Sequence, residues 1–258
     1  MQKVIYKDLG KMDYQAAWDY QESLLQENVR IKTEARERAN ATEASSDVAS
    51  GGGLVALAED GAPATRHYLL FVEHPPVYTL GKSGHQENVL IGEDEMQKRG
   101  IQFFRSNRGG DITFHGPGQL VGYPILDLER FYTDIGRYLR NLEEVGIRLL
   151  ADYGIGAGRS AGETGVWIGP DNIGGARKIC AIGVRCSRWV TMHGFALNVS
   201  TDLAYFGDII PCGIADKEVT SMEKELGRPV DLEEVKERWK YFFAEVFSVE
   251  LVTKNPLE

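Results

Sequence analysis

RKICAIGVRC at residues 177–186 and WVTMHGFALNV at residues 189–199 are two apolar runs of strand length, close together in the chain. Apolar runs of this length with many β-branched and aromatic residues are typical of strands. Similar patterns lie in both directions along the chain, at 3–6, 68–73, 77–81, 101–106, 120–128 and 164–169. Strands therefore dominate the middle of the sequence.

Helical patterns flank these strands without regular alternation. One begins at Thr133 or Asp134 and ends near Tyr153, and another runs from Leu232 to about Phe247. Both place apolar residues at helical spacing, and an aspartate or threonine at the start can cap the first turn. The pattern predicts an α+β fold with a mixed, largely antiparallel sheet flanked by helices.

The whole chain, 1–258, is predicted to form a single domain, because we find neither internal repeats nor a second core after a linker. The segment at about 31–66 is the exception. Its first part continues a helical pattern with a mostly charged face, and residues 41–66 are rich in Ala, Ser, Gly and Asp with little periodicity. We expect an insertion or mobile segment there.

Charge and cysteine content narrow the class of protein. A formal net charge of −9 argues against general binding to nucleic acid or anionic membranes. No apolar run approaches the length of about 18 residues that crosses a bilayer, and the N-terminus lacks a targeting pattern. Cys180, Cys186 and Cys212 lack C-x-x-C spacing, so neither a disulfide framework nor a cysteine-rich zinc site is expected. We expect a cytoplasmic monomer without metal or cofactor.

The stretch RGGDITFHGPGQL at 108–120 holds four glycines, with Arg108 and His115 among them. Glycine weakens the interior of helices and strands, so this stretch is predicted to be poor in both. Bare backbone offers N–H donors and lets a ligand approach closely. One interpretation is a binding loop for an anion or carbonyl group, and the other is a long connection full of turns.

Other candidate residues stand in or beside strand patterns. EHPPVYTLG at 73–81 predicts either a rigid hairpin connection through Pro75–Pro76 or a site wall formed by His74, Tyr78 and Thr79. His193 and Gly194 interrupt a strand, and an interior glycine often marks close approach by a ligand. Cys212 lies between Pro211 and Gly213, where irregular backbone could present a nucleophile, although most cysteines are buried hydrophobes.

Taken together and in this order, RGGDITFHGPGQLVGYPILDL, GVWIG, KICAIGVR, HGFALNV and PCGI closely resemble the lipoyl(octanoyl) transferase family. EHPPVYTLG resembles the family's upstream block. The similarity covers roughly residues 66–215 through several independent motifs. It implies a fold similar to the catalytic domains of biotin protein ligases and lipoate ligases. The long segment before His67 departs from the family pattern and leaves substrate access and partner docking open.

The resemblance implies a role for each matched position. Cys212 matches the acyl-thioester nucleophile, and Lys178 matches its lysine partner. Three further segments match the lining of the acyl substrate: Arg108, Gly109, Gly110, Asp111, Ile112, Thr113, Phe114 and His115; Ala181, Ile182 and Gly183; and Gly194, Phe195 and Ala196. A nearby cation raises the thiolate fraction of a cysteine, so one lysine suffices to activate the thiol.

The resemblance also implies the substrates. Octanoyl-acyl carrier protein would donate the acyl group, and a lysine on lipoyl domains of 2-oxoacid dehydrogenase E2 subunits or on glycine-cleavage H protein would accept it. Two alternatives stay open: an ATP-dependent lipoate or biotin ligase, which needs no cysteine nucleophile, and a non-catalytic module that binds lipoyl-type domains. The presence of Cys212 and Lys178 favours the transferase.

An acidic carrier protein would need a local basic surface on this acidic chain. The motif segments contain several basic residues that could form one, namely Arg105, Arg108, Arg177, Lys178, Arg185 and Arg188. The alternative is that these are scattered, solvated residues.

Overall fold

The computed structural model describes residues 1–46, 64–172, 175–210 and 218–253. Its main element is a nine-stranded sheet in the order β12-β1-β2-β6-β10-β9-β8-β7, with β11 beside β9. The strands are β1 (Gln2–Lys11), β2 (His67–Glu73), β6 (Gln119–Ile125), β7 (Ala157–Gly158), β8 (Val166–Ile168), β9 (Arg177–Ser187), β10 (Val190–Asn198), β11 (Glu218–Val219) and β12 (Val249–Thr253). Three pairings are parallel and the other five antiparallel, which confirms the predicted mixed sheet.

A second sheet of three strands lies beside the first. It contains β4 (Gln102–Arg105), β3 (Val77–Leu80) and β5 (Ile112–His115) in that order. The predicted hairpin across Pro75–Pro76 is wrong, because β2 pairs with β1 and β6 whereas β3 pairs with β4 and β5. The prolines carry the chain from one sheet to the other. The glycine-rich stretch also contributes a strand, β5, because pairing with β3 overrides its weak local preference.

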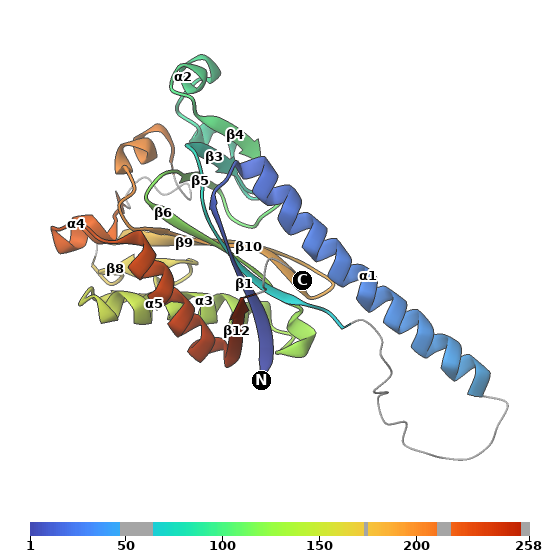
Figure 1. The fold of residues 1–258 in the computed structure, drawn as a ribbon. Coiled ribbons are helices and arrows are strands. Elements are labelled where there is room, and N and C mark those ends of the chain that lie inside the picture. The colour runs from blue at the N-terminus through green and yellow to red at the C-terminus, as the bar shows by residue number, and fades with distance from the viewer. Residues whose placement is uncertain (47–63, 173–174, 211–217, 254–258) are drawn as a thin grey trace.

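Helices cover both faces of the large sheet (Figure 1). The described helices are α1 (Tyr14–Ser46), α2 (Glu93–Lys98), α3 (Ile135–Asp152), α4 (Met222–Leu226) and α5 (Leu232–Phe247), with short 3-10 turns at Gln86–Asn88, Leu128–Arg130 and Leu203–Asp208. Of these, α2 packs against the small sheet. α3 and α5 enclose the larger core, and α1 lies along β10 and β6 over a smaller one. Asp134 and Asp231 cap α3 and α5 by accepting backbone N–H groups.

The buried stripe of α1 contains polar residues as well as apolar ones. Gln21, Asn28 and Lys32 are all less than a tenth exposed and recur at helical spacing. Asn28 exchanges two hydrogen bonds with the backbone of Arg66, each 2.8 Å long. Beyond Lys32 the helix continues as an arm that leaves the body, with residues 35–41 exposed (Figure 1). Residues 31–46 of the predicted insertion are therefore helical, and 47–63 lie outside the described residues.

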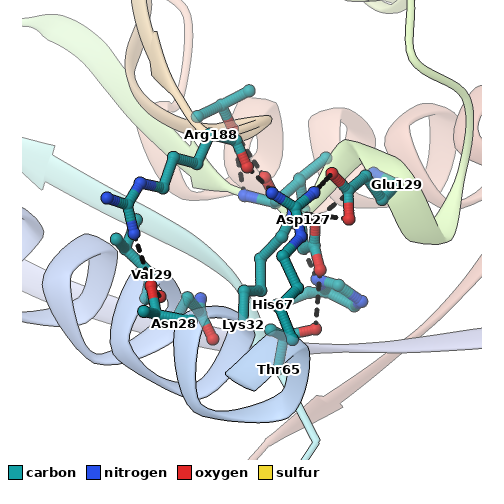
Figure 2. Close-up of polar contacts among 12 residues, drawn as sticks. Asn28, Val29, Lys32, Thr65, His67, Asp127, Glu129 and Arg188 are labelled. Atoms are coloured by element: carbon teal, nitrogen blue, oxygen red, sulfur yellow. Dashed lines mark hydrogen bonds and ion pairs between the residues drawn. The ribbon is translucent and has the colours of Figure 1, made fainter. Parts of the chain in front are cut away.

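Lys32 attaches α1 to the body through buried polar contacts (Figure 2). Its ammonium lies 2.5 Å from Asp127 Oδ1 and 3.1 Å from Glu129 Oε2, and it donates to the carbonyl of Arg188 at 2.8 Å. The hydroxyl of Thr65 donates to the other Asp127 oxygen. This ion cluster joins α1 to the start of β2 and to the β9–β10 turn.

Replacing Lys32 with methionine is expected to lower the free energy of unfolding by about 3–5 kcal/mol, because Asp127 would remain buried without its cation. Arg36→Ala is the matched control: Arg36 pairs with the same Glu129 but is 66% exposed, so its loss should cost less than about 1 kcal/mol. Urea unfolding measures both. Equal, small losses would show that the cluster does not stabilise the attachment.

Across the parts of the chain that the structure describes, no helix is long and apolar enough to span a membrane.

Candidate active site

A cavity of about 600 Å³ opens between the large and small sheets. Its walls come from β5, β6, β9 and β10, the first turn of α1, and the loops around residues 83–85, 108–111 and 162–164. Most residues that the sequence assigned to a site line it, namely Arg108, Gly110, Asp111, Ile112, Thr113, His115, Lys178, Ala181, Ile182, Gly183, His193, Gly194, Phe195 and Ala196. Segments distant in sequence therefore converge on one space.

Five of the assigned residues that the structure describes do not line this cavity. Thr79 is buried and accepts hydrogen bonds from Arg108. Phe114 stacks on Tyr205, and the Tyr78 hydroxyl donates to Asp208 and to the carbonyl of Tyr205, so both belong to the core of the small sheet. His74 is buried behind the wall, against Tyr123. Gly109 uses its N–H to bond the carbonyl of Val184. Cys212 lies outside the described residues.

The glycines of the 108–120 stretch allow backbone to lie against backbone. A Cβ on Gly183 would lie 2.7 Å from the carbonyl oxygen of Gly109, and a Cβ on Gly81 would lie 2.2 Å from that of Gly110. Gly110 also has a φ of +89°, which side chains rarely tolerate. The loop thus joins β9 to the end of β3 and forms the seam between the two sheets at the cavity.

His115 and His193 in the cavity wall, and His74 behind it, are neutral. Burial lowers the pKa of His115 and His193 to about 3 and that of His74 to about 4, so none carries a charge at neutral pH. His74 Nε2 lies 2.7 Å from the hydroxyl of Tyr123, and His193 Nε2 lies 2.7 Å from Asn107 Oδ1. These bonds hold the rings in place beside the cavity.

A hydrogen-bonded row of side chains in the cavity wall connects β5 with the segment after β11. His115 bonds Gln119 at 2.8 Å, Gln119 donates to Asn198 at 2.8 Å, and Asn198 donates to the carbonyl of Thr220 at 3.0 Å. Thr220 in turn donates its N–H to the carbonyl of Lys178. The strand with Lys178 is thereby connected to the opposite wall.

The two described cysteines are poorly suited to nucleophilic attack. Cys180 is fully buried, and burial raises the pKa of its thiol strongly. Cys186 lies on the exposed side of β9 near the β9–β10 turn, and partial burial of its thiol raises the pKa. A thiolate is the reactive form, so neither environment favours reaction.

Comparison with known proteins gives the family. The family described as lipoyl protein ligase A/B catalytic domain matches residues 54–244. An octanoyltransferase from Flavobacterium johnsoniae is 53% identical over 251 residues, covering 97% of this chain and 99% of that relative. The chain belongs to the octanoyltransferase family. The relationship expected from the motifs is confirmed.

Solved structures share the fold of this octanoyltransferase family member at low sequence identity. A bipartite lipoate protein ligase from Thermoplasma acidophilum has a TM-score of 0.64 at 17% identity, covering 98% of this chain and 87% of the other. A biotin protein ligase from Aquifex aeolicus, in complex with biotin and ATP, has a TM-score of 0.50 at 12% identity, covering 95% and 70%. The predicted similarity of fold to both kinds of ligase is confirmed.

The six basic residues of the motif segments do not form one free patch. Arg177 pairs with Glu225, and Arg185 pairs with Glu22. Arg108 is buried, and its guanidinium donates to the carbonyl and hydroxyl of Thr79. Partners within the chain therefore occupy at least these three side chains, and a basic docking surface that includes Arg105, Lys178 and Arg188 stays a prediction.

Sequence reasoning missed several residues of the wall. Tyr14, Tyr123, Glu163, Thr164 and Asn198 all line the cavity. Tyr14 is the first residue of α1, and its ring stacks on His115, a contact between elements about a hundred residues apart. Asn198 was recognisable as a polar residue ending an otherwise apolar strand, directly after the HGFAL motif.

Proposed function

We propose that this chain transfers an octanoyl group from octanoyl-acyl carrier protein to a lysine of a lipoyl domain, through a thioester on Cys212. One observation carries the proposal: β11, the strand that follows Cys212, pairs with the β9 residues Arg177 and Lys178. The chain before Cys212 is held as well, because Ile210 donates its N–H to the carbonyl of Asn88 at 2.8 Å. The flank after Cys212 thus reaches the cavity, which Lys178 and Val219 line, and Asn88 on the other side donates to Asp111 in the cavity wall.

The cavity wall suits an uncharged acyl chain. Val121, Ile182, Phe195 and Ala196 supply apolar surface, and the histidines beside them are neutral. Burial of apolar surface contributes roughly 25 cal/mol for each Å² removed from water, so an acyl chain gains binding free energy here without a specific polar contact.

The reaction has two steps. In the first, the Cys212 thiolate attacks the donor thioester carbon, the bond from that carbon to the carrier sulfur breaks, and the Lys178 ammonium gives its proton to the departing sulfur. In the second, the acceptor lysine amine attacks the new thioester, Lys178 takes the amine proton, and the Cys212 sulfur leaves as a thiolate. An amide forms and Lys178 regains its starting charge.

We also propose the domain organisation, the oligomeric state, the acceptor proteins and the cellular compartment of this chain. We take residues 1–258 as one catalytic domain, since β1 and β12 at the two ends of the chain pair within the same sheet. We propose a monomer as the active unit. The acceptors are the lipoyl domains of 2-oxoacid dehydrogenase E2 subunits and glycine-cleavage H protein. Free thiols at Cys180 and Cys186 suit the reducing cytoplasm.

Incubation with octanoyl-acyl carrier protein and an unmodified lipoyl domain tests the function. The acceptor should gain about 126 Da, an octanoyl group in place of hydrogen, in a buffer without ATP. Modification only with free octanoate and ATP would instead identify a ligase. Binding of the lipoyl domain without any modification would identify a non-catalytic module.

Lys178→Ala tests the role given to the lysine. Without the nearby cation, the Cys212 thiolate loses its electrostatic stabilisation, so alkylation near pH 7 should slow about tenfold or more and its pH profile should move to higher pH. Iodoacetamide labelling followed by peptide mass spectrometry measures this, with Cys186 in the same sample as an internal reference. An unmoved profile would remove Lys178 from thiol activation.

A further inference from the structure

Lys178 points into the cavity because β9 is irregular at this point. Val166 of β8 pairs with Cys180, but the next residue, Trp167, pairs with Lys178, so Ile179 is an extra residue in β9. In a regular strand, Lys178 and Cys180 would share one face. Here Ile179 and Cys180 both lie in the core under α3 and α5, whereas Lys178 lines the cavity. Bulges of this kind often redirect a side chain beside an active site.

Trp167 and Gly165 both lie against the redirected side chain. The ammonium of Lys178 lies 4.6 Å from the centre of the Trp167 ring, its cross-strand neighbour, within the range of a cation–π interaction. Gly165 lies beside the lysine stem: a Cβ added there would be 3.6 Å from Cε and 3.7 Å from Cδ of Lys178, which are ordinary packing distances. The same Cβ would be only 2.7 Å from the carbonyl oxygen of Cys180, so a side chain at this position would displace the β9 backbone that carries Lys178. Gly165 also has a φ of +129°, so its conformation depends on glycine.

Gly165 is fixed from outside the cavity by a buried carboxylate on α3. Its N–H donates to Glu143 Oε1 at 3.0 Å. The other oxygen, Glu143 Oε2, lies 2.8 Å from the guanidinium of Arg140 and 3.0 Å from that of Arg159. Glu143 is fully buried, and the proposed reaction gives it no chemical step. It holds both ends of the 159–165 loop against α3.

We propose that Glu143 and Gly165 are positioning residues that set the direction of the Lys178 ammonium in the cavity. This inference rests on the proposed function, in which Lys178 handles the protons. Glu143 acts through Gly165, whose backbone limits where the lysine stem can lie, and neither residue contacts the acyl group. Because proton transfer depends steeply on geometry, a displacement of the stem should lower kcat more than it raises KM.

Gly165→Ala tests the inference, with Gly154→Ala as its matched control. Both replacements put alanine at positive φ, but a Cβ on Gly154 has no atom within 4 Å. We expect Gly165→Ala to lower kcat about tenfold or more with KM for a small octanoyl thioester within about twofold, and Gly154→Ala to leave both unchanged. An equal fall of kcat in the two variants would overturn the inference.

The same replacement in the Lys178→Ala background separates this inference from the proposed function. If Gly165 acts through Lys178, Gly165→Ala should have no further effect on kcat there. The same fold-loss in both backgrounds would overturn the positioning role and leave the proposed function standing. Lys178→Ala without any effect would overturn the proposed lysine chemistry itself.

Glu143→Gln provides a second route if Gly165→Ala does not fold. The amide keeps an acceptor for the Gly165 N–H but weakens the two arginine pairs, so a fall in kcat of about two- to fivefold is expected, again absent in the Lys178→Ala background. Wild-type kcat in Glu143→Gln together with wild-type kcat in Glu143→Leu would show that Glu143 does not position Lys178.

Discussion

Cys212→Ala is expected to abolish octanoyl transfer, with a loss in kcat of about 10³-fold or more, because removing a nucleophile eliminates the covalent route. Cys180→Ala and Cys186→Ala are the matched controls. Both thiols have a raised pKa, and neither lines the cavity, so both variants should keep near-normal turnover. Turnover is measured by the mass increase of the acceptor domain. Full activity in Cys212→Ala would end the thioester mechanism.

Acid is expected to destabilise the fold strongly between pH 6.5 and 4. Burial lowers the pKa of His67 and His74 to about 4 and that of His115 and His193 to about 3. In the unfolded chain the same groups titrate near 6.5, so as the pH falls the unfolded state takes up protons that the folded state refuses. The stability is complete above pH 6.5 and declines by about 1.4 kcal/mol per pH unit for each histidine.

Urea unfolding at pH 7, 6 and 5 measures this decline. The exposed fifth histidine provides the control: His85 is 69% exposed, and His85→Gln should leave the pH dependence unchanged. Removing a buried histidine, as in His67→Gln, should reduce the slope even if it also lowers the stability at pH 7. A free energy of unfolding that is constant from pH 7 to 5 would show that these histidines are not held neutral by burial.

Local patterns in the sequence were sufficient to predict the regular elements. The caps of α3 and α5, the apolar stripe with Leu142 and Leu149, and both strands of the β9–β10 hairpin lie where the pattern indicates. Small errors arose where two apolar residues are adjacent. In α5, the apolar pattern predicts that Phe242 faces inward; Phe243 is fully buried, and Phe242 is partly buried against the same core.

Long-range pairing was not predictable from these patterns. Nothing local in residues 249–253 indicates a parallel pairing with β1, about 245 residues earlier in the chain. The small sheet was missed for the same reason, since β5 depends on β3 for its backbone hydrogen bonds. Because of these pairings, Tyr78 and Phe114 pack into the core of the small sheet, whereas His115, next to Phe114, lines the cavity.

The cavity itself was predicted in part. Motif residues on β9 and β10 converge there because the two strands are adjacent and antiparallel, which a sequence pattern can suggest. The contribution of Tyr14, and the support of Lys178 by Gly165 and Glu143, depend on packing between elements that carry no common motif. Such contacts appear only when the fold is known.

The most direct measurement of the proposed mechanism is the intact mass of the protein after brief incubation with octanoyl-acyl carrier protein and no acceptor. We expect one adduct of about 126 Da on the peptide that contains Cys212, labile to hydroxylamine as a thioester is. The adduct should be transferred when a lipoyl domain is added. Octanoylation of the acceptor without any enzyme adduct, or an adduct on Cys186 in its place, would contradict it.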